Sequence, residues 1–234
     1  MTTTIPISPQ LIRRFNEAAG LAREGDLEGS LKAWERLLNP TEAEKQGPPR
    51  TITGDFLGQA YMRKAWVLMD LGRHVEARAV FEDPVMRACL GQFSLSVLYD
   101  YYFSYANTLG NLGDVSAMDD AFTRAMNVAA DELGDRHRMH LCWSNLLTWA
   151  EGAHAWEYID VETETCLQYA ANVGDQVLAG IAQLSRAMEL ARLGRKDEAR
   201  SIVQPMMESA RESGLSGLLE RTELDVADRA PVGA

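Results

Sequence analysis

Residues 65–81 read AWVLMDLGRHVEARAVF, and a fold class can be predicted from them. Gly72 stands between two apolar stretches of helical periodicity, and glycine readily adopts the left-handed backbone conformation that closes a helix. Ala65 lies seven positions before Gly72 and Ala77 lies five positions after it. Small side chains at these two places let antiparallel helices approach each other closely. The stretch therefore predicts a helical hairpin with its turn at Gly72.

The same pattern surrounds three further glycines, Gly25, Gly113 and Gly194. In each copy a small residue stands seven positions before the glycine and a leucine stands four positions before it. A small or apolar residue follows at the fifth and ninth positions after the glycine. The residues at these four places are Ala18, Leu21, Ser30 and Trp34; Ala65, Leu68, Ala77 and Phe81; Ala106, Leu109, Met118 and Phe122; and Ala187, Leu190, Ala199 and Val203.

A weaker copy is placed around Gly152, where Asn145, Thr148 and Glu157 replace the small and apolar residues. The whole set resembles the tetratricopeptide repeat (TPR) over roughly residues 10–210. The glycines are 39 to 47 residues apart, which is longer than the usual repeat of about 34 residues. The resemblance implies an all-α, right-handed superhelical array of about five antiparallel helix hairpins, followed by a C-terminal helix.

We expect one repeat domain over residues 1–234. The predicted units lie near 8–38, 54–82, 94–132, 135–173 and 175–213, with a terminal helix at 215–228. Periodicity and breaker residues place helices at 8–24, 27–38, 54–71, 74–82, 94–112, 115–132, 135–151, 154–173, 175–193 and 196–213. Residues 39–53 are predicted to form a long loop, and Pro84 and Gly91 are expected to break the chain between the second and third units.

The composition agrees with a helical globular protein and excludes several function classes. Of the 234 residues, 46% are apolar and 24% are charged, so a packed core is expected and disorder is excluded. The net charge is −11, and the acidic surplus lies almost wholly in residues 101–234. Such a surface cannot neutralise phosphates, so nucleic acid and anionic membranes are not expected as partners.

The sequence favours a cytoplasmic location. The N-terminal residues lack a basic segment followed by an apolar one, and no run of apolar residues is long enough for a membrane span. Cys89, Cys142 and Cys166 are odd in number and have no CxxC spacing. They suggest neither a disulfide framework nor a zinc site, which fits a reducing compartment.

No catalytic or cofactor-binding motif is recognised, so we expect a protein that is not an enzyme and needs no cofactor. His137 and His140 share a helical face, as metal ligands often do. They lack a third ligand at helical spacing, and Arg136 and Arg138 would repel a cation. A polar helix start is therefore the preferred interpretation, and no metal site is expected.

In the resembled family, the first helix of each hairpin lines a concave groove. The positions three, six and ten before each glycine should face it, and they are mostly apolar here. Only Asn107 and Arg63 are similar to the polar residues with which some family members bind an acidic C-terminal peptide. The predicted peptide-binding groove consists of Met62, Arg63, Trp66, Met69, Phe103, Asn107, Leu146, Trp149 and Met188.

An acidic patch is predicted at Glu157, Asp160 and Glu164, which share a helical face. No Lys or Arg occurs between Arg138 and Arg186, so local counter-charges are absent from the sequence. The patch is interpreted either as ordinary solvated surface or as a surface that steers a basic partner.

The expected function is a non-catalytic adaptor or scaffold that binds a peptide or helical segment of a partner protein in the apolar groove. Two other functions stay open, namely a peptide-responsive regulatory sensor and an enzyme of unrecognised type. The groove could also be filled by the chain's own segment 215–221. Exposed apolar surface could be buried by formation of a homo-oligomer.

Overall fold

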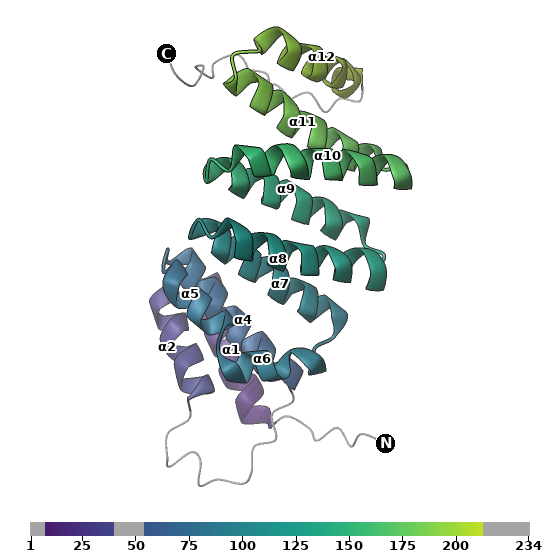
Figure 1. Cartoon of the computed structure of the whole chain (residues 1–234). Helices are drawn as coiled ribbons and strands as arrows, with labels where there is room; N and C mark the ends of the chain where they lie inside the picture. The colour runs from purple at the N-terminus through teal and green to yellow at the C-terminus, as the bar shows by residue number, and fades with distance from the viewer. Residues whose placement is uncertain (1–7, 40–53, 213–234) are drawn as a thin grey trace. The chain divides into compact units, whose positions relative to one another are not determined.

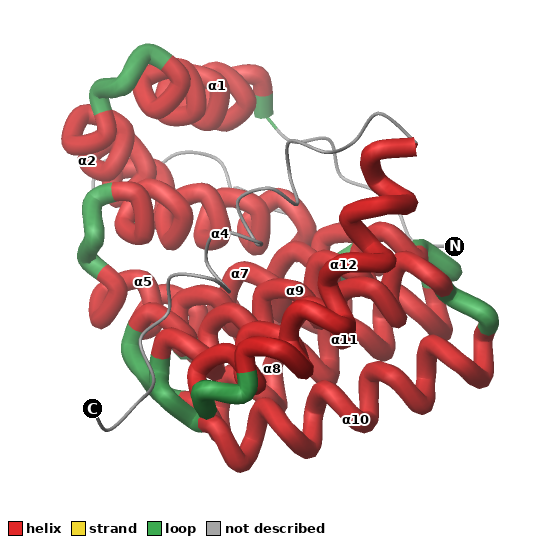
Figure 2. The backbone as a smooth tube through the Cα atoms, turned by 90° about the horizontal axis from the view of Figure 1, so that it is seen from above, coloured by secondary structure: helices red, strands yellow, loops and turns green. Residues whose placement is uncertain are grey.

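The computed structural model describes residues 8–39 and 54–212 (Figure 1). These residues form eleven α-helices, and none of them belongs to a β-strand (Figure 2). The chain divides into two compact units, Met1–Arg136 and His137–Ala234. The all-α prediction is confirmed for the described ranges, whereas the single superhelical domain stays a prediction. The predicted helix at 215–228 and the predicted loop beyond Asn39 lie outside the described residues.

The first unit contains three helical hairpins. They are α1 (Pro9–Arg23) with α2 (Leu27–Leu38), α4 (Gly54–Asp70) with α5 (His74–Phe81), and α7 (Leu95–Asn111) with α8 (Val115–Asn127). The short helix α6 (Pro84–Cys89) and the 3-10 turn η1 (Leu90–Gln92) are inserted between the second and third hairpins. A π-helical turn, η2 (Val128–Glu132), continues α8. Neighbouring helices of this unit pack in chain order, with α2 against α4 and α5 against α7.

The second unit contains four helices among its described residues. It consists of α9 (Arg136–Gly152), α10 (Trp156–Val173), α11 (Gln176–Arg192) and α12 (Lys196–Glu212). All ten helices predicted within the described residues are present, and their ends agree within two residues when η2 is counted with α8. Over the described ranges, no helix is both long enough and apolar enough to cross a bilayer.

The hairpin turns share one backbone geometry. At Gly72, with φ 72°, the turn N–H donates to the carbonyl of Met69 at 2.9 Å and the next N–H donates to the carbonyl of Leu68 at 2.8 Å. The turns at positions 25, 113 and 194 repeat this pattern on glycines with φ of 73° to 87°. The predicted turn glycines are therefore the residues that carry the left-handed conformation, which glycine adopts without a steric penalty.

The turn between α9 and α10 has its left-handed residue at His154 and not at Gly152. His154 has φ 57°, and its N–H donates to the carbonyl of Glu151 while the next N–H donates to the carbonyl of Ala150. Gly152 is the last residue of α9. With His154 as the turn residue, successive turns from Gly72 onward lie 40 or 41 residues apart. This more regular spacing shifts every repeat position in α9 by two residues.

The small residues of the repeat lie where the paired helices meet. Ala18, Ala65, Ala106 and Ala187 are all 0% exposed. Trp34, Phe81 and Phe122, at the ninth position after their turns, are also 0% exposed. In the first hairpin the Ser30 hydroxyl donates to the carbonyl of Ala18 at 2.7 Å, across the contact between α1 and α2. The predicted close approach of helices at these alanines is confirmed.

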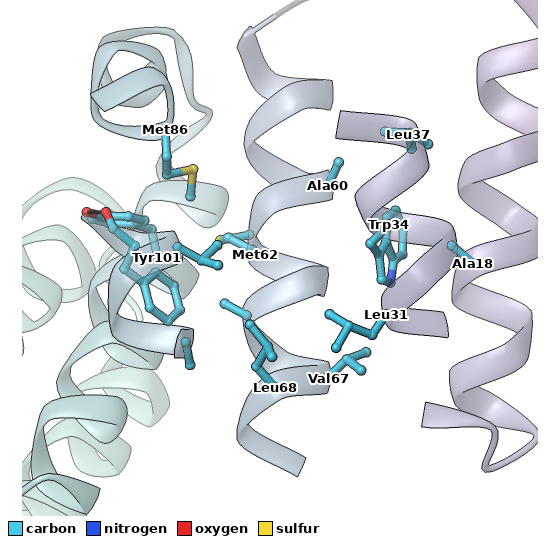
Figure 3. Packing of buried hydrophobic residues seen from close by; sticks show 14 residues of the cluster. Ala18, Leu31, Trp34, Leu37, Ala60, Met62, Val67, Leu68, Met86 and Tyr101 are labelled. Atoms are coloured by element: carbon cyan, nitrogen blue, oxygen red, sulfur yellow. Dashed lines mark hydrogen bonds between the residues drawn. The ribbon is translucent and has the colours of Figure 1, made fainter. Parts of the chain in front are cut away.

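The core of the first unit continues from one hairpin to the next. Trp34 of α2 packs between α1 and α4, beside Leu31, Val67 and Ala60 (Figure 3). Its ring meets Phe15 edge-on, with ring centroids 4.9 Å apart. The cluster extends through Met62 to Met86 of the inserted helix (Figure 3). Since each hairpin shares its core with the next, no hairpin of this cluster buries its apolar face alone.

The inserted helix α6 was not predicted, because Pro84 was interpreted only as a breaker. Pro84 instead occupies the first helical turn, where the missing N–H has no intrahelical acceptor in any case. Asp83 caps this helix by accepting a hydrogen bond from the Val85 N–H at 2.8 Å. After η1, the Phe93 ring packs directly on Gly58 of α4. The insertion is therefore fastened to α4.

Candidate functional site

A cleft of about 340 Å³ opens between α1 and α4 in the first unit. Its lining includes equivalent repeat positions of the two hairpins, since Ala19 and Trp66 each lie six positions before their turn glycine. The full lining is Phe15, Ala19, Ala22, Arg23, Trp34, Arg63, Trp66, Val67 and Asp70. The structure thus brings Arg63 and Trp66 of the predicted groove together with the groove positions of the first hairpin.

Trp66 forms a fixed wall of this cleft. Its indole N–H donates to the Ser104 hydroxyl of α7 at 2.7 Å, which holds the half-buried ring in one orientation. The guanidinium carbon of Arg63 lies 4.6 Å from the centre of the Trp66 ring, a cation–π arrangement. Arg63 is exposed, and no residue of the described ranges forms an ion pair with it. It therefore leaves a positive charge at the mouth of an aromatic cleft.

The floor of the cleft is the buried Trp34. Its indole N–H has no hydrogen-bond partner among the described residues, so a buried donor lies unsatisfied beneath the cleft. Three exposed charged side chains stand at the edge, namely Arg23, Arg63 and Asp70. The sequence pattern assigned Trp34 only to the core, and it did not select Arg23 or Asp70. The cleft is accordingly apolar inside and carries a net positive charge at its rim.

Two other predicted groove residues of α4 do not line the cleft. Met62 is only 3% exposed and belongs to the core. Met69 is half-buried, and its sulfur accepts a hydrogen bond from the Thr108 hydroxyl at 3.2 Å. Both residues lie behind the Trp66 wall of the cleft. They were predicted to face the groove, but the packing of α4 against α7 includes their positions as well.

The predicted groove residues of α7 are half-buried but lie outside this cleft. Phe103 stacks on Tyr99 with ring centroids 5.5 Å apart and meets Phe122 edge-on at 5.9 Å. The Asn107 amide donates to the carbonyl of Phe103 at 2.8 Å. Asn107 is thus tied to its own helix.

In the second unit, the predicted groove residues differ in exposure. Leu146 is fully buried, whereas Trp149 and Met188 are half-buried. The burial of Leu146 follows from the turn at His154, which places Ser144, Thr148 and Glu151 at the repeat positions that face the groove. The face of α9 that was predicted to line an apolar groove therefore carries polar side chains.

The predicted acidic patch has a counter-charge that the sequence did not reveal. Glu157, Asp160 and Glu164 are exposed on α10, as expected. Asp160, however, pairs with Arg186 of α11. The same guanidinium also contacts Glu189 at 3.2 Å. The interpretation of a patch without local cations is therefore corrected at Asp160.

Glu189 is a buried carboxyl group with 6% of its surface exposed. Burial raises its pKa, and a hydrogen bond to Asp160 adds to this effect, while Arg186 and Arg192 oppose it. The Arg192 guanidinium lies 3.8 Å from the centre of the Trp156 ring. These side chains join α10 to α11.

His140 was considered as a metal ligand, but in the structure it contacts Asp175. Its Nε2 lies 2.8 Å from Asp175 Oδ2, and Asp175 is buried. Asp175 also caps α11 by accepting from the N–H groups of Val177 and Leu178. The hydrogen bond from His140, followed by that from Leu178, lowers the pKa of Asp175. The pair therefore fastens the start of α11 to α9.

Burial makes Cys166 a poor nucleophile. Cys89, Cys142 and Cys166 are buried and form no disulfide among the described residues. Burial, with a smaller contribution from Glu162, raises the pKa of Cys166 to about 12. A thiolate is the reactive form of cysteine, so this thiol stays unreactive at neutral pH. Within the described part of the chain, no three His, Cys, Asp or Glu side chains are grouped to hold a metal ion.

Comparison with protein-family models, curated proteins and solved structures finds no match to this chain. The resemblance to the tetratricopeptide repeat therefore rests on the residue pattern. The α1–α4 cleft unites aromatic walls, an unsatisfied buried indole N–H and a positive rim.

Proposed function

We propose that this protein is a non-catalytic adaptor that binds a peptide or helical segment of a partner protein in the cleft between α1 and α4. The observation that carries the proposal is the position of the cleft. It lies on matching helix faces of two consecutive hairpins, where Ala19 keeps one wall low and Trp66 forms the other. A shallow wall beside a broad indole surface suits a protruding apolar side chain.

The cleft has room for one or two side chains, since ligand sites usually begin at about 300 Å³. Burial of one Leu or Phe side chain contributes about 1.5–3 kcal/mol. Aromatic and arginine residues are also the commonest sources of binding energy at protein interfaces. Arg23 and Arg63 at the rim favour a segment with an acidic residue near the apolar anchor.

The hairpin architecture supports this proposal in general terms. Within each unit we propose TPR-like hairpins, because buried small residues alternate with turns of one geometry. Repeats of this kind commonly present their first helices to a ligand. A cytoplasmic location belongs to the same proposal and rests on three cysteines that form no disulfide among the described residues.

Selection from a displayed random peptide library tests the proposal. Selection on the wild-type protein should return peptides with a shared apolar anchor. Ala19→Arg places a long side chain in the cleft, and Trp66→Ala removes its wall. Each should weaken the selected peptides by about 2 kcal/mol, or about thirtyfold in Kd. Ala79→Arg, at an exposed alanine of α5, is the matched control and should leave Kd unchanged.

Thermal unfolding of each variant shows whether the protein is still folded when binding is measured. Selected peptides that bind Ala19→Arg and Trp66→Ala as tightly as the wild type would refute the assignment of this cleft. If the selected peptides bind Ala79→Arg as weakly as they bind Ala19→Arg, the added charge, rather than the filled cleft, is responsible for the loss.

A further inference from the structure

A second cleft, of about 350 Å³, opens on another face of α7. It lies between the inserted α6–η1 segment, α7 and α8, and Tyr101 and Tyr105 contribute to its α7 wall. At 100° per residue, these tyrosines lie on the side of α7 roughly opposite to Phe103 and Asn107. The cleft is therefore separate from the predicted groove, and the insertion that interrupts the repeat pattern supplies one of its walls.

The aromatic wall of the second cleft is held rigidly. The Tyr101 hydroxyl donates to the carbonyl of Phe81 at 2.9 Å, and the Tyr105 hydroxyl donates to Glu82 Oε1 at 2.6 Å. Burial raises the pKa of each phenol to about 12, so both stay neutral. Tyr101 is only 2% exposed and supports the wall from within the core, whereas the half-buried rings of Tyr102 and Tyr105 present apolar surface to a ligand. A ring whose hydroxyl group is already bound, such as that of Tyr105, needs no further ordering on binding.

Positive charge enters this cleft from two elements. Arg87 belongs to α6 and Arg124 to α8, and the Arg124 guanidinium lies 5.7 Å from the centre of the Tyr102 ring. Neither arginine forms an ion pair with a carboxylate of the described ranges, whereas Arg78 close by pairs with two acidic residues. Asp120 is the one acidic side chain in the lining. The lining therefore carries a net charge of about +1 at neutral pH.

We propose that this second cleft binds a small carboxylic acid with an aromatic or apolar stem. The carboxylate would be bound by Arg87 and Arg124, and the stem would pack against the tyrosine rings and Leu90. A net charge of about +1 matches a monovalent carboxylate better than a doubly charged phosphate. The cleft volume lies near the lower limit for small-molecule sites, so it has room for a compact free acid.

Ligand-observed NMR titration of the full chain at low ionic strength tests this proposal. Phenylpropionate is the main probe, phenylpropionamide is the neutral match of the same shape, and phenyl phosphate supplies the dianion. A peptide with adjacent phenylalanine and glutamate, blocked at both ends, represents a carboxylate from a protein partner. We expect phenylpropionate to bind most tightly of the four and to lose affinity as salt is added.

Variants of exposed side chains complete the test. Arg87→Gln and Arg124→Gln should each weaken phenylpropionate by about tenfold or more, as expected for loss of a charge-assisted hydrogen bond. Arg200→Gln on α12 makes the same change of net charge and should have no effect. Asp120→Asn should strengthen binding severalfold, a gain that loss of folding cannot produce.

Three results would overturn the proposal. The first is phenylpropionamide binding as tightly as phenylpropionate. The second is binding of the blocked peptide or of phenyl phosphate in place of the free acid. The third is equal loss of affinity in Arg87→Gln and Arg200→Gln, which would show a general charge effect. None of these outcomes bears on the α1–α4 cleft, so the two proposals can fail separately.

Discussion

Replacement of Gly58 by alanine should destabilise the protein, although alanine is the better helix former. A Cβ atom built on Gly58 would lie 2.0 Å from both Cε1 and Cζ of Phe93. Carbon atoms in contact are normally about 3.5–4.0 Å apart, so the Phe93 ring would have to move by about 1.5 Å or more. Overpacking of this kind costs about 1–3 kcal/mol. The helix gains about 0.5–1 kcal/mol from the exchange of glycine for alanine, so we expect a net loss of about 1–2 kcal/mol.

Gly20 in the interior of α1 is the matched control. A Cβ atom at this position would meet nothing within 4 Å. Gly20→Ala should therefore stabilise the protein by about 0.5–1 kcal/mol. The two replacements are chemically identical and both lie in helices of the first unit. Urea unfolding followed by circular dichroism should place them on opposite sides of the wild type.

A double-mutant cycle identifies Phe93 as the cause. In a Phe93→Ala background the added methyl group has room, so Gly58→Ala should become stabilising. The coupling energy between the two positions should then be about 2 kcal/mol. If Gly58→Ala is as stable as Gly20→Ala in the wild-type background, Phe93 does not rest on α4. The inserted segment would then not be fastened to α4 at this contact.

Three further predictions concern the turns and the buried charges. His154→Gly should stabilise the protein by about 0.5–1 kcal/mol in urea unfolding, because glycine removes the cost of a left-handed histidine; a clear loss would contradict the turn assignment. Asp175 has a lowered pKa, so its contribution to stability is present above its unfolded pKa, near 3.9, and is lost as the pH falls through the folded value. Asp175→Asn should flatten the acid limb of the unfolding free energy, and an unchanged limb would exclude the His140 contact as its origin. Glu189 has a raised pKa, so its contribution is present below its unfolded pKa, near 4.3, and is lost as the pH rises through the folded value. Glu189→Gln should reduce this loss of stability with rising pH, and a pH profile identical to that of the wild type would refute the raised pKa of Glu189.

The helices and most turns could be predicted because they depend on local chemistry. Gly25, Gly72, Gly113 and Gly194 adopt left-handed conformations that few other residues tolerate, so their positions in the sequence show the turns directly. A histidine does not indicate a left-handed turn, so the turn at His154 was predicted two residues too early, at the nearby Gly152. The regular spacing of 40 or 41 residues was the remaining clue to this turn.

The short helix α6 was missed because Pro84 has two opposite meanings. A proline inside a helix breaks it, whereas a proline in the first turn begins one. The capping residue Asp83 directly before Pro84 favours the second meaning. Without α6 the cleft beside Tyr102 could not be foreseen, since one wall of that cleft comes from the insertion.

The candidate sites depend on contacts between residues far apart in the sequence. Periodicity could place Trp66 on the groove face of its helix, and it lines the α1–α4 cleft. It could not show that Trp34 lies beneath that cleft, because the ninth position after a turn is a core position in every repeat. The partner of Asp160 is likewise found only in the fold, since Arg186 lies 26 residues away.

Fluorine NMR with 5-fluorotryptophan gives the most direct test of the α1–α4 cleft as the partner-binding site. The chain has five tryptophans, so each can be assigned by a single Trp→Phe variant. On addition of a peptide selected by the wild-type protein, we expect the signals of Trp34 and Trp66 to shift in proportion to occupancy. The signals that should stay in place are those of Trp143, Trp149 and Trp156. Shifts confined to these three, with Trp66 unchanged at saturation, would contradict the account.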